Sequence, residues 1–230
     1  MDDATRTAIQ IYTMQSIDEA VAIAELGVDH VGMAPADRGL PGEISPGLAF
    51  DICRAVEGLA TSVALTVDTN LAVIEEMVRV VQPDVLHLCG PIGAVGPDAV
   101  GELRRSLPGV RIMQAIAVTG PEAIAMATSY ASHVDFLLLD SVDPTIEGVG
   151  AAGFVHDWDL SAAIVQAVDV PVILAGGLSP ANVRDAITAV APWGVDSLTH
   201  TNRPLAGGGF CKDLELVARF IAGSREGWGA

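Results

Sequence analysis

Several side chains that can donate or accept protons stand at the ends of short apolar runs. Asp140 ends the run FLLLD at 136–140, so a buried strand would carry this carboxyl group to its own end. Burial there would raise the pKa of the carboxyl group and suit it to general acid catalysis. An aspartate in such a place can also brace a neighbouring loop, because its oxygens accept backbone N–H groups. Asp140 is the first catalytic candidate.

His87 and Cys89 alternate in the segment HLC at 87–89, so both side chains should point to the same side of a strand. Either could accept a proton. A packed, hydrogen-bonded histidine beside an inert thiol is an equal alternative, since free cysteines are among the most buried residues. Tyr12 ends another apolar run. Because the ordinary pKa of tyrosine is about 10, Tyr12 would be a poor base, and we interpret it as a positioning group.

The segment LAGGLSPANV at 174–183 has the composition of a phosphate-binding loop. Gly176 and Gly177 would let the backbone approach a ligand, and a helix beginning at Ser179 and Pro180 would attract an anion. A simple tight turn is the alternative, since glycine pairs are common in turns. Further candidates for substrate binding follow other predicted strands: Arg38, Thr199 and His200.

Short β-branched or apolar runs alternate with helix-length segments along the whole chain. Start signals mark four of the helices: Ser16 and Thr119 open capping boxes, and Ser45 and Ser179 each precede a proline. The predicted strands lie near 8–12, 28–33, 62–67, 84–88, 111–116, 134–139, 171–174 and 195–198.

This alternation predicts an α/β fold, a single parallel (β/α)8 TIM barrel that takes in residues 1–230 as one domain. In such a barrel the active site lies at the carboxyl ends of the strands, where the candidate residues stand. The second possibility is an open doubly wound sheet. It is less favoured because the first strand, in AIQIYTM at 8–14, is not followed by a GxGxxG sequence.

Composition excludes several classes of protein. Half of the 230 residues are hydrophobic, yet no apolar run reaches the ~20 residues that a membrane span needs, so we expect no membrane partner and a cytoplasmic location. The net charge of -17 disfavours nucleic acid as a partner. Three scattered cysteines, Cys53, Cys89 and Cys211, form neither a disulfide framework nor a metal motif.

The sequence resembles the phosphoribosylanthranilate isomerase family of tryptophan biosynthesis. LAGGLSPANVRDAI at 174–187 is similar to the family's LAGGLxPENVxxAI, and VDFLLLDS at 134–141 is similar to its VDxLLLDS. Weaker similarities occur in LGVDHVGM at 26–33, DVLHLCG at 84–90 and KDLELVARFI at 212–221. The resemblance covers nearly the whole chain and implies the barrel fold.

The resemblance also implies a reaction. Members of the family isomerise a phosphorylated N-ribosyl amine to an aminodeoxyketose by acid–base catalysis, and their acid corresponds to Asp140. Their phosphate grip corresponds to Gly176 and Gly177. Their base is a cysteine in a KICG motif, where this chain reads QIYT with Tyr12 in its place. Either His87 or Cys89 would then replace the missing base, or the substrate has changed.

Other departures fall near the same places. The loop with Arg38 only loosely matches the family's SPR loop, and Thr199 and His200 stand where the family has a Ser-Ser-Gly phosphate loop. A small phosphorylated metabolite is the expected partner, and no cofactor and no metal are expected.

Three alternatives remain open. The chain could be a phosphosugar-binding barrel of this family that has lost its catalysis. A Schiff-base aldolase is disfavoured because the one lysine, Lys212, is expected to open the last helix, away from the barrel mouth. A metal-dependent epimerase would need His87, Asp140 and His200 to converge as ligands.

Overall fold

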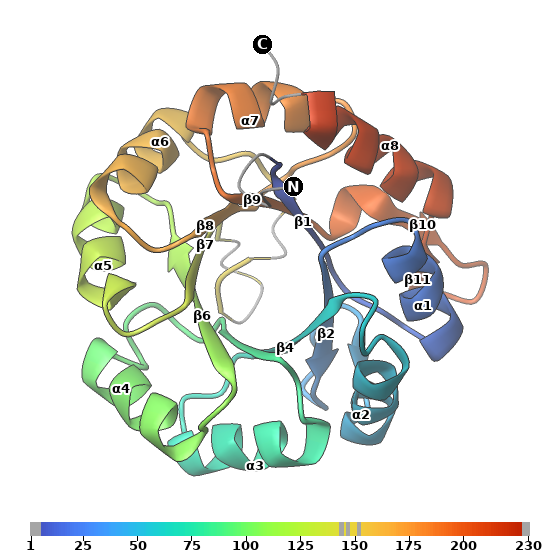
Figure 1. Cartoon of the computed structure of the whole chain (residues 1–230), viewed down its shortest axis with the longest axis horizontal. Helices are drawn as coiled ribbons and strands as arrows, with labels where there is room; N and C mark the ends of the chain where they lie inside the picture. Colours follow the sequence, from blue (N-terminus) through green and yellow to red (C-terminus); the bar gives the residue numbers. More distant parts are fainter. Residues whose placement is uncertain (1–5, 143–144, 146–147, 151–152, 227–230) are drawn as a thin grey trace.

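Eight parallel strands form a closed ring in the computed structural model of the chain (Figure 1). The structure describes residues 6–142, 145, 148–150 and 153–226. Strands of this ring are buried on both faces, which explains why they read as continuous apolar runs in the sequence. They are β1 (Ala8–Ile11), β2 (His30–Pro35), β4 (Thr61–Thr66), β5 (Val85–Leu88), β6 (Arg111–Ala117), β7 (Phe136–Asp140), β8 (Val172–Leu174) and β9 (Gly194–Ser197).

The first strand closes the ring by pairing on both sides. Gln10 of β1 faces His30 of β2 and Asp196 of β9, each in parallel register. This closure confirms the predicted barrel and shows that the open doubly wound sheet was wrong. Because all eight strands of the closed ring are parallel, their carboxyl ends meet at one mouth.

Eight α-helices among the described residues surround the ring (Figure 1). None of them is both long enough and apolar enough to cross a membrane. Their bounds are α1 (Ile17–Glu25), α2 (Pro46–Ala55), α3 (Leu71–Val81), α4 (Pro97–Ser106), α5 (Glu122–Ala131), α6 (Trp158–Ala167), α7 (Val183–Val190) and α8 (Leu214–Glu226).

Two of the four predicted helix starts are correct. The hydroxyl groups of Ser16 and Ser45 accept the N–H groups of Glu19 and Leu48, as N-caps do. The starts predicted at Thr119 and Ser179 were wrong, since α5 begins at Glu122 and α7 begins at Val183. Residues 179–182 form a separate turn in which the Ser179 hydroxyl accepts the N–H of Ala181.

Both ends of every predicted strand lie within two residues of the ends of an observed strand. Three short strands were not predicted. β3 (Glu43–Ile44) extends the sheet beside β2, and β10 (Asn202–Pro204) pairs with β11 (Phe210–Lys212) in an antiparallel hairpin. The glycine-rich segment 206–209 is the turn of this hairpin, which follows β9 at the mouth of the barrel.

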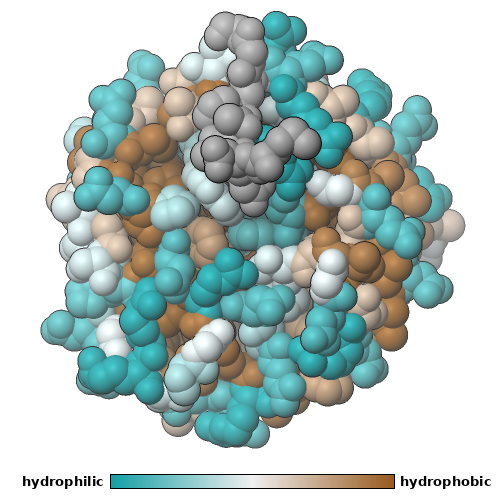
Figure 2. Space-filling view, in the orientation of Figure 1, coloured by the Kyte–Doolittle hydropathy of each residue, from teal (hydrophilic) through white to brown (hydrophobic). Residues whose placement is uncertain are grey.

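Apolar side chains form two layers. One fills the ring of strands and includes Val63, Val85, Met113 and Leu138. The larger layer lies between strands and helices and contains Phe220 among its fully buried members. Figure 2 shows hydrophilic residues around the rim of one face with apolar patches between them, as expected for helices that turn one side to the barrel.

Candidate active site

The candidate residues come together at the carboxyl ends of the strands. Asp140 is the last residue of β7, and Tyr12 and Cys89 directly follow β1 and β5. With His87 they line a pocket of about 610 Å³, part of which is open to solvent. We call it the tyrosine pocket. Its other lining residues are Thr13, Ala34, Leu40, Pro41, Leu65, Val67, Leu138, Val149, Gly150, Asp196 and Leu198.

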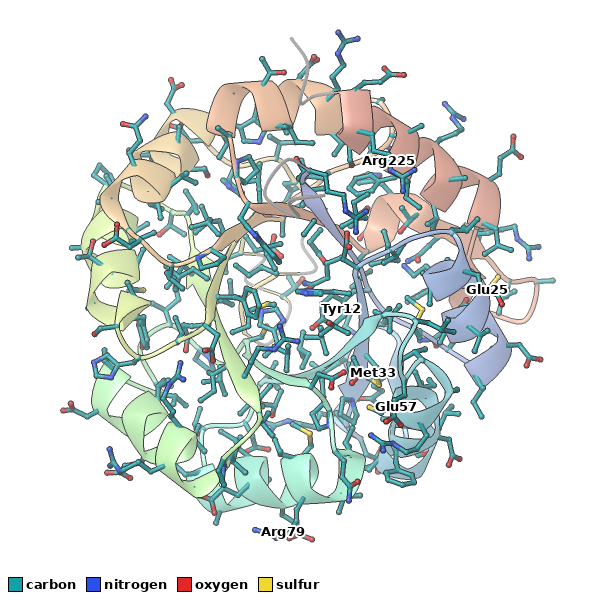
Figure 3. All side chains as sticks on the ribbon, viewed as in Figure 1. Tyr12, Glu25, Met33, Glu57, Arg79 and Arg225 are labelled. Atoms are coloured by element: carbon teal, nitrogen blue, oxygen red, sulfur yellow. The ribbon has the colours of Figure 1, made fainter. Side chains whose placement is uncertain are left out.

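Tyr12, His87 and Cys89 form one hydrogen-bonded row across the pocket. The Tyr12 hydroxyl lies 2.9 Å from Nδ1 of His87, and Nε2 of His87 lies 3.2 Å from Sγ of Cys89. The alternation of residues 87 and 89 therefore does place both side chains on the inner side of the strand. Figure 3 shows Tyr12 inside the ring of strands, where its ring packs on Gly32 so closely that a Cβ there would lie 2.4 Å from it.

Burial determines the protonation states of this row. It raises the pKa of the Tyr12 hydroxyl and of the Cys89 thiol well above their ordinary values. The same burial lowers the pKa of His87 to about 3, which makes its imidazole a weak base. All three groups are therefore neutral at neutral pH.

Asp140 has the environment that was expected for an acid. Burial raises the pKa of its carboxyl group to about 7, although the N–H and hydroxyl groups of Ser141 donate to Oδ1 and favour the ionised form. The loop after β7 comes close to its other oxygen, since a Cβ on Gly150 would lie 2.7 Å from Oδ2. Gly150 also has a φ of 107°, a conformation that side chains disfavour.

Asp196 is a functional candidate that the sequence reasoning missed. It stands on β9, lines the tyrosine pocket and is buried, and this burial together with the nearby Asp140 carboxyl group raises its pKa to about 8. Within the described part of the chain, its Oδ1 is buried without a hydrogen-bond partner. A charged oxygen in that state is costly, so the carboxyl group resists ionisation. The signal was an acidic residue inside a predicted apolar strand.

A second pocket of about 280 Å³, part of which is open to solvent, adjoins the first and shares Asp140, Asp196 and Leu198 with it. We call it the glycine pocket. It brings together most of the residues predicted to bind phosphate, and its other lining residues are Gly153, Gly176, Gly177, Leu178, Ser197, Thr199 and His200. His200 Nε2 lies 3.4 Å from the carbonyl oxygen of Gly153.

Gly176 and Gly177 are glycines for a structural reason. Both have positive φ, 79° and 65°. A Cβ on Gly176 would lie 2.6 Å from Nδ1 of His156, and one on Gly177 would lie 2.7 Å from the carbonyl carbon of Phe154. The loop after β8 can therefore approach the loop after β7 only without side chains, which leaves backbone to line the pocket.

Arg38 does not line either pocket. Its guanidinium group bonds to the carboxylate of Asp68 at 2.8 Å, which joins the loops after β2 and β4. Glu43 holds the first of these loops by accepting the N–H groups of residues 38–40, and these bonds lower the pKa of Glu43. The loop instead presents Leu40 and Pro41 to the tyrosine pocket.

Lys212 was expected at the start of the last helix, and that placement was wrong. It belongs to β11, and its side chain is buried. The amine donates to the carbonyl oxygen of Leu198 at 3.0 Å, and to the side-chain oxygens of Thr201 and Asn202. Burial lowers its pKa to about 7. Through these hydrogen bonds the amine holds the loop after β9 in place, and it does not line the tyrosine pocket.

The metal hypothesis gains no support from the geometry. Among the residues that the structure describes, no three His, Cys, Asp or Glu side chains are placed to hold a metal ion. His87 is engaged with Tyr12 and Cys89, and His200 belongs to the glycine pocket. What the site does contain is a pair of buried carboxyl groups where two pockets meet.

Comparison with known proteins identifies one family over most of the chain. The profile of the family described as N-(5'phosphoribosyl)anthranilate (PRA) isomerase matches residues 9–221. The N-(5'-phosphoribosyl)anthranilate isomerase of Natronomonas pharaonis is 36% identical over 212 residues, which cover 92% of this chain and 93% of that protein.

Solved structures of similar proteins have the same fold. The phosphoribosyl anthranilate isomerase from Thermococcus kodakaraensis is 26% identical, with a TM-score of 0.76 over 95% of this chain and 99% of that one. Another is a phosphoribosyl anthranilate isomerase in complex with reduced 1-(o-carboxyphenylamino)-1-deoxyribulose 5-phosphate, 24% identical with a TM-score of 0.73 over 95% of this chain and 98% of that one. The second likeness is one of fold alone.

Proposed function

Since this chain belongs to the N-(5'-phosphoribosyl)anthranilate isomerase family, we propose that Asp140 and Asp196 are the acid–base pair of its reaction. The chain is a phosphoribosylanthranilate isomerase-like enzyme, which converts a phosphorylated ribosyl amine into an aminodeoxyketose. One observation carries the assignment: two buried carboxyl groups line the same pocket, with their pKa values raised to about 7 and about 8. Such a pair holds one proton between them near neutral pH.

The substrate would span both pockets. We place its phosphate in the glycine pocket, among the backbone of Gly176 and Gly177 and the residues Thr199 and His200. The sugar then lies over Asp140 and Asp196, where the pockets meet, and the amine substituent enters the tyrosine pocket. The relative that binds a carboxyphenylamino deoxyribulose phosphate supports a ligand of this shape.

In this arrangement Asp140 protonates the ring oxygen of the ribosyl amine, and the bond between that oxygen and C1 breaks to give an iminium ion. The base then removes the proton from C2, and the electron pair moves to the nitrogen to form an enolamine. Protonation of C1 and loss of the proton from the C2 hydroxyl give the ketone. The protons taken and returned balance, so no cofactor is consumed.

Three groups could serve as the base. His87 is a weak base, because burial lowers its pKa to about 3. Cys89 is rarely a thiolate, because burial and the two aspartates raise the pKa of its thiol. Asp196 has a carboxyl group whose pKa lies near the working pH, as efficient proton transfer requires. We therefore assign the base to Asp196, which acts in the protonation state where the one shared proton lies on Asp140, and Cys89 becomes the group to test against it.

Tyr12 and His87 act as positioning residues in this scheme. The row from the Tyr12 hydroxyl through His87 to Cys89 holds one wall of the tyrosine pocket in place. We also propose that Tyr12 stands where other members of the family have their catalytic cysteine, because it directly follows β1 in the segment QIYT. Because a thiol is then missing from this position, the carboxyl group of Asp196 would serve as the base in its place.

The experiment compares three variants with freshly prepared N-(5'-phosphoribosyl)anthranilate. Asp140→Asn and Asp196→Asn should each lower kcat/KM by about 10²–10⁴, the usual worth of a general acid or base, while Cys89→Ala should lose less than about tenfold. A large loss in Cys89→Ala with activity kept in Asp196→Asn would move the base to Cys89. Tight binding of product without turnover by the unaltered protein would instead favour a binding barrel that has lost its catalysis.

We further propose that the chain works as one barrel domain in the cytoplasm. The family profile extends over residues 9–221 without division, which supports one domain. Limited proteolysis that releases a stable fragment shorter than the barrel would contradict the first point, and fractionation of cells would test the second.

A further inference from the structure

The buried amine of Lys212 has no part in the proposed acid–base reaction, yet it contacts the loop that lines the glycine pocket. Residues 198–200 of this loop are among the lining residues of that pocket. Nζ of Lys212 donates to the carbonyl oxygen of Leu198 at 3.0 Å, to Oγ1 of Thr201 at 3.3 Å and to Oδ1 of Asn202 at 2.5 Å. One amine therefore fixes three points of the loop after β9.

These three bonds require the charged form of the amine. The carbonyl oxygen of Leu198 and the side-chain oxygen of Asn202 can only accept. The hydroxyl group of Thr201 gives its own hydrogen to the carbonyl oxygen of Leu198 at 3.0 Å, so it also accepts from the amine. An ammonium group has three N–H donors, whereas a neutral amine has two. Loss of the proton from Lys212 therefore costs the loop at least one of its bonds.

Opposing effects act on the charge of this amine. Burial favours the neutral form and lowers the pKa of Lys212 to about 7, although Glu19 of α1, Asp196 of β9 and the neighbouring Cys211 favour the ammonium form. Lys212 also lines a surface groove whose other charged residues are Asp18, Arg203, Asp213 and Glu215. Because the two forms are close in free energy near neutral pH, one further negative charge nearby would decide between them.

A phosphate in the glycine pocket would supply such a charge. Asp196 lines that pocket. Besides the burial that dominates both of their pKa values, Asp196 and Lys212 act on each other, since the charge of each favours the ionised form of the other. The electrostatic effect of a group in the pocket thus reaches the amine. A phosphate group carries nearly two negative charges at neutral pH, so its effect on the amine should exceed that of one carboxylate.

We propose that Lys212 is a positioning residue for the phosphate of the substrate: its ammonium form holds the loop after β9 in the shape that completes the glycine pocket, and the bound phosphate stabilises that charged form in return. Above neutral pH, the phosphate then binds together with one proton from the solvent. Lys212 is not a lining residue of the pocket, so it acts through the loop and through its charge. This inference rests on the proposed function, because it takes the place of the phosphate from there.

The first test uses the unaltered protein. Because Lys212 is the one lysine of the sequence, growth with lysine labelled with ¹³C at Cε gives a single labelled side chain, whose NMR shift follows the charge of the amine as the pH rises. We expect saturating ribose 5-phosphate to raise the pKa of Lys212 by about one unit or more, and ribose at the same concentration to leave it unchanged.

Two outcomes of this titration would overturn the inference. An unchanged pKa of Lys212 with ribose 5-phosphate bound means that the amine does not respond to the phosphate. If ribose 5-phosphate does not bind at all, the glycine pocket is no phosphate site, and the proposed placement of the substrate fails together with the inference.

Variants test the role of the amine in binding. Lys212→Met removes the charge and the three donors, and we expect Kd for ribose 5-phosphate and KM for N-(5'-phosphoribosyl)anthranilate to rise together by about tenfold or more. At the pH optimum of each protein, kcat should change by less than about threefold. Lys212→Arg keeps a positive charge and should recover part of the affinity. Arg219→Met, an exposed change on α8, removes a positive charge elsewhere and should alter neither constant.

A fall in kcat with KM unchanged in Lys212→Met, or an equal rise of KM in Arg219→Met, contradicts the inference. If Lys212→Met does not fold, the titration of the unaltered protein decides. The same readouts separate this inference from the proposed function. A response of Lys212 to ribose 5-phosphate in a protein that does not turn over N-(5'-phosphoribosyl)anthranilate keeps the inference and rejects the reaction. Turnover that is lost in Asp140→Asn, while the pKa of Lys212 ignores the ligand, keeps the reaction and rejects the inference.

Discussion

The two pockets adjoin each other and share Asp140, Asp196 and Leu198, yet they are built from different parts of the chain. The tyrosine pocket combines the ionisable side chains of Tyr12, His87, Cys89, Asp140 and Asp196 with a largely apolar wall. The glycine pocket owes its shape to Gly176 and Gly177, where two loops approach without side chains between them. Backbone geometry therefore governs binding in the glycine pocket, and burial of ionisable groups governs chemistry in the tyrosine pocket.

The largest contrast is expected from Gly177→Ala. The added Cβ would lie 2.7 Å from the carbonyl carbon of Phe154, at a φ of 65° that alone costs alanine about 1–2 kcal/mol. The loop after β8 must then move away from the phosphate. We expect KM for N-(5'-phosphoribosyl)anthranilate to rise about 10–100-fold with a much smaller change in kcat.

Gly47→Ala is the matched control for that variant. Gly47 lies in α2, where a Cβ would meet no atom within 4 Å, so KM should be unchanged and stability slightly higher. If Gly177→Ala lowers kcat and leaves KM as it is, the phosphate does not bind where we place it, and the contrast between the pockets is lost.

The pH dependence of the reaction should separate the pockets next. Below about pH 7 both aspartates are protonated and no base remains, and above about pH 8 both are ionised and no acid remains. We therefore expect a bell-shaped profile of kcat with its maximum between these values and a fall of about tenfold per pH unit outside them. Inhibition by a phosphorylated ketose should instead follow the ionisation of the phosphate near pH 6. A flat kcat between pH 6 and 9 would exclude the carboxyl pair.

Burial of the Asp196 carboxyl group also predicts that Asp196→Asn lowers the activity and raises the stability of the protein. The folded-state pKa is raised to about 8 from an unfolded value of about 3.9, so the folded protein keeps a proton that the unfolded chain releases between these values. Stability from this group is therefore present at pH 4 and lost as the pH rises to 8. We expect the variant to exceed the unaltered protein by a few kcal/mol in urea unfolding at pH 8, and by little at pH 4.5.

Asp51→Asn, an exposed change on α2, controls for the loss of one negative charge from an acidic protein. It should not reproduce the gain at pH 8. Should both variants gain equally, overall charge repulsion explains the effect, and Asp196 is not destabilised by burial.

The sequence predicts the two pockets unequally, for physical reasons. The strands and the glycine pair follow from local patterns. The predicted ends of the strands therefore lie within two residues of the observed ends, and one pocket brings together Gly176, Gly177, Thr199 and His200. Asp196 was missed because one acidic residue in a short apolar strand does not reveal that its carboxyl group will lie near that of Asp140, which stands on the other side of β8.

Interactions between loops could not be predicted either, because local sequence patterns do not show which loops meet. Arg38 pairs with Asp68 from another loop, and Lys212 folds back through a hairpin that reads only as a glycine-rich stretch. The helix start expected at Ser179 failed because the same serine can cap a single turn as well as a helix. Ionisable side chains in loops are thus the part of a barrel that sequence reasoning places least well.

The smallest expected effect concerns Tyr12→Phe, which keeps the ring and removes the hydroxyl group that contacts Nδ1 of His87. Tyr130→Phe is a close match, because Tyr130 is equally buried at 3% exposure and its hydroxyl donates to the carbonyl oxygen of Val95 at 2.7 Å. Each change should cost about 1–3 kcal/mol of stability by leaving a buried partner unsatisfied. Only Tyr12→Phe should also lower kcat, by a few-fold, since the hydroxyl positions His87 and Cys89 beside the reacting carbon. Equal kcat in the two variants would make Tyr12 a packing residue, and a loss of a hundredfold or more would make it part of the proton transfer itself.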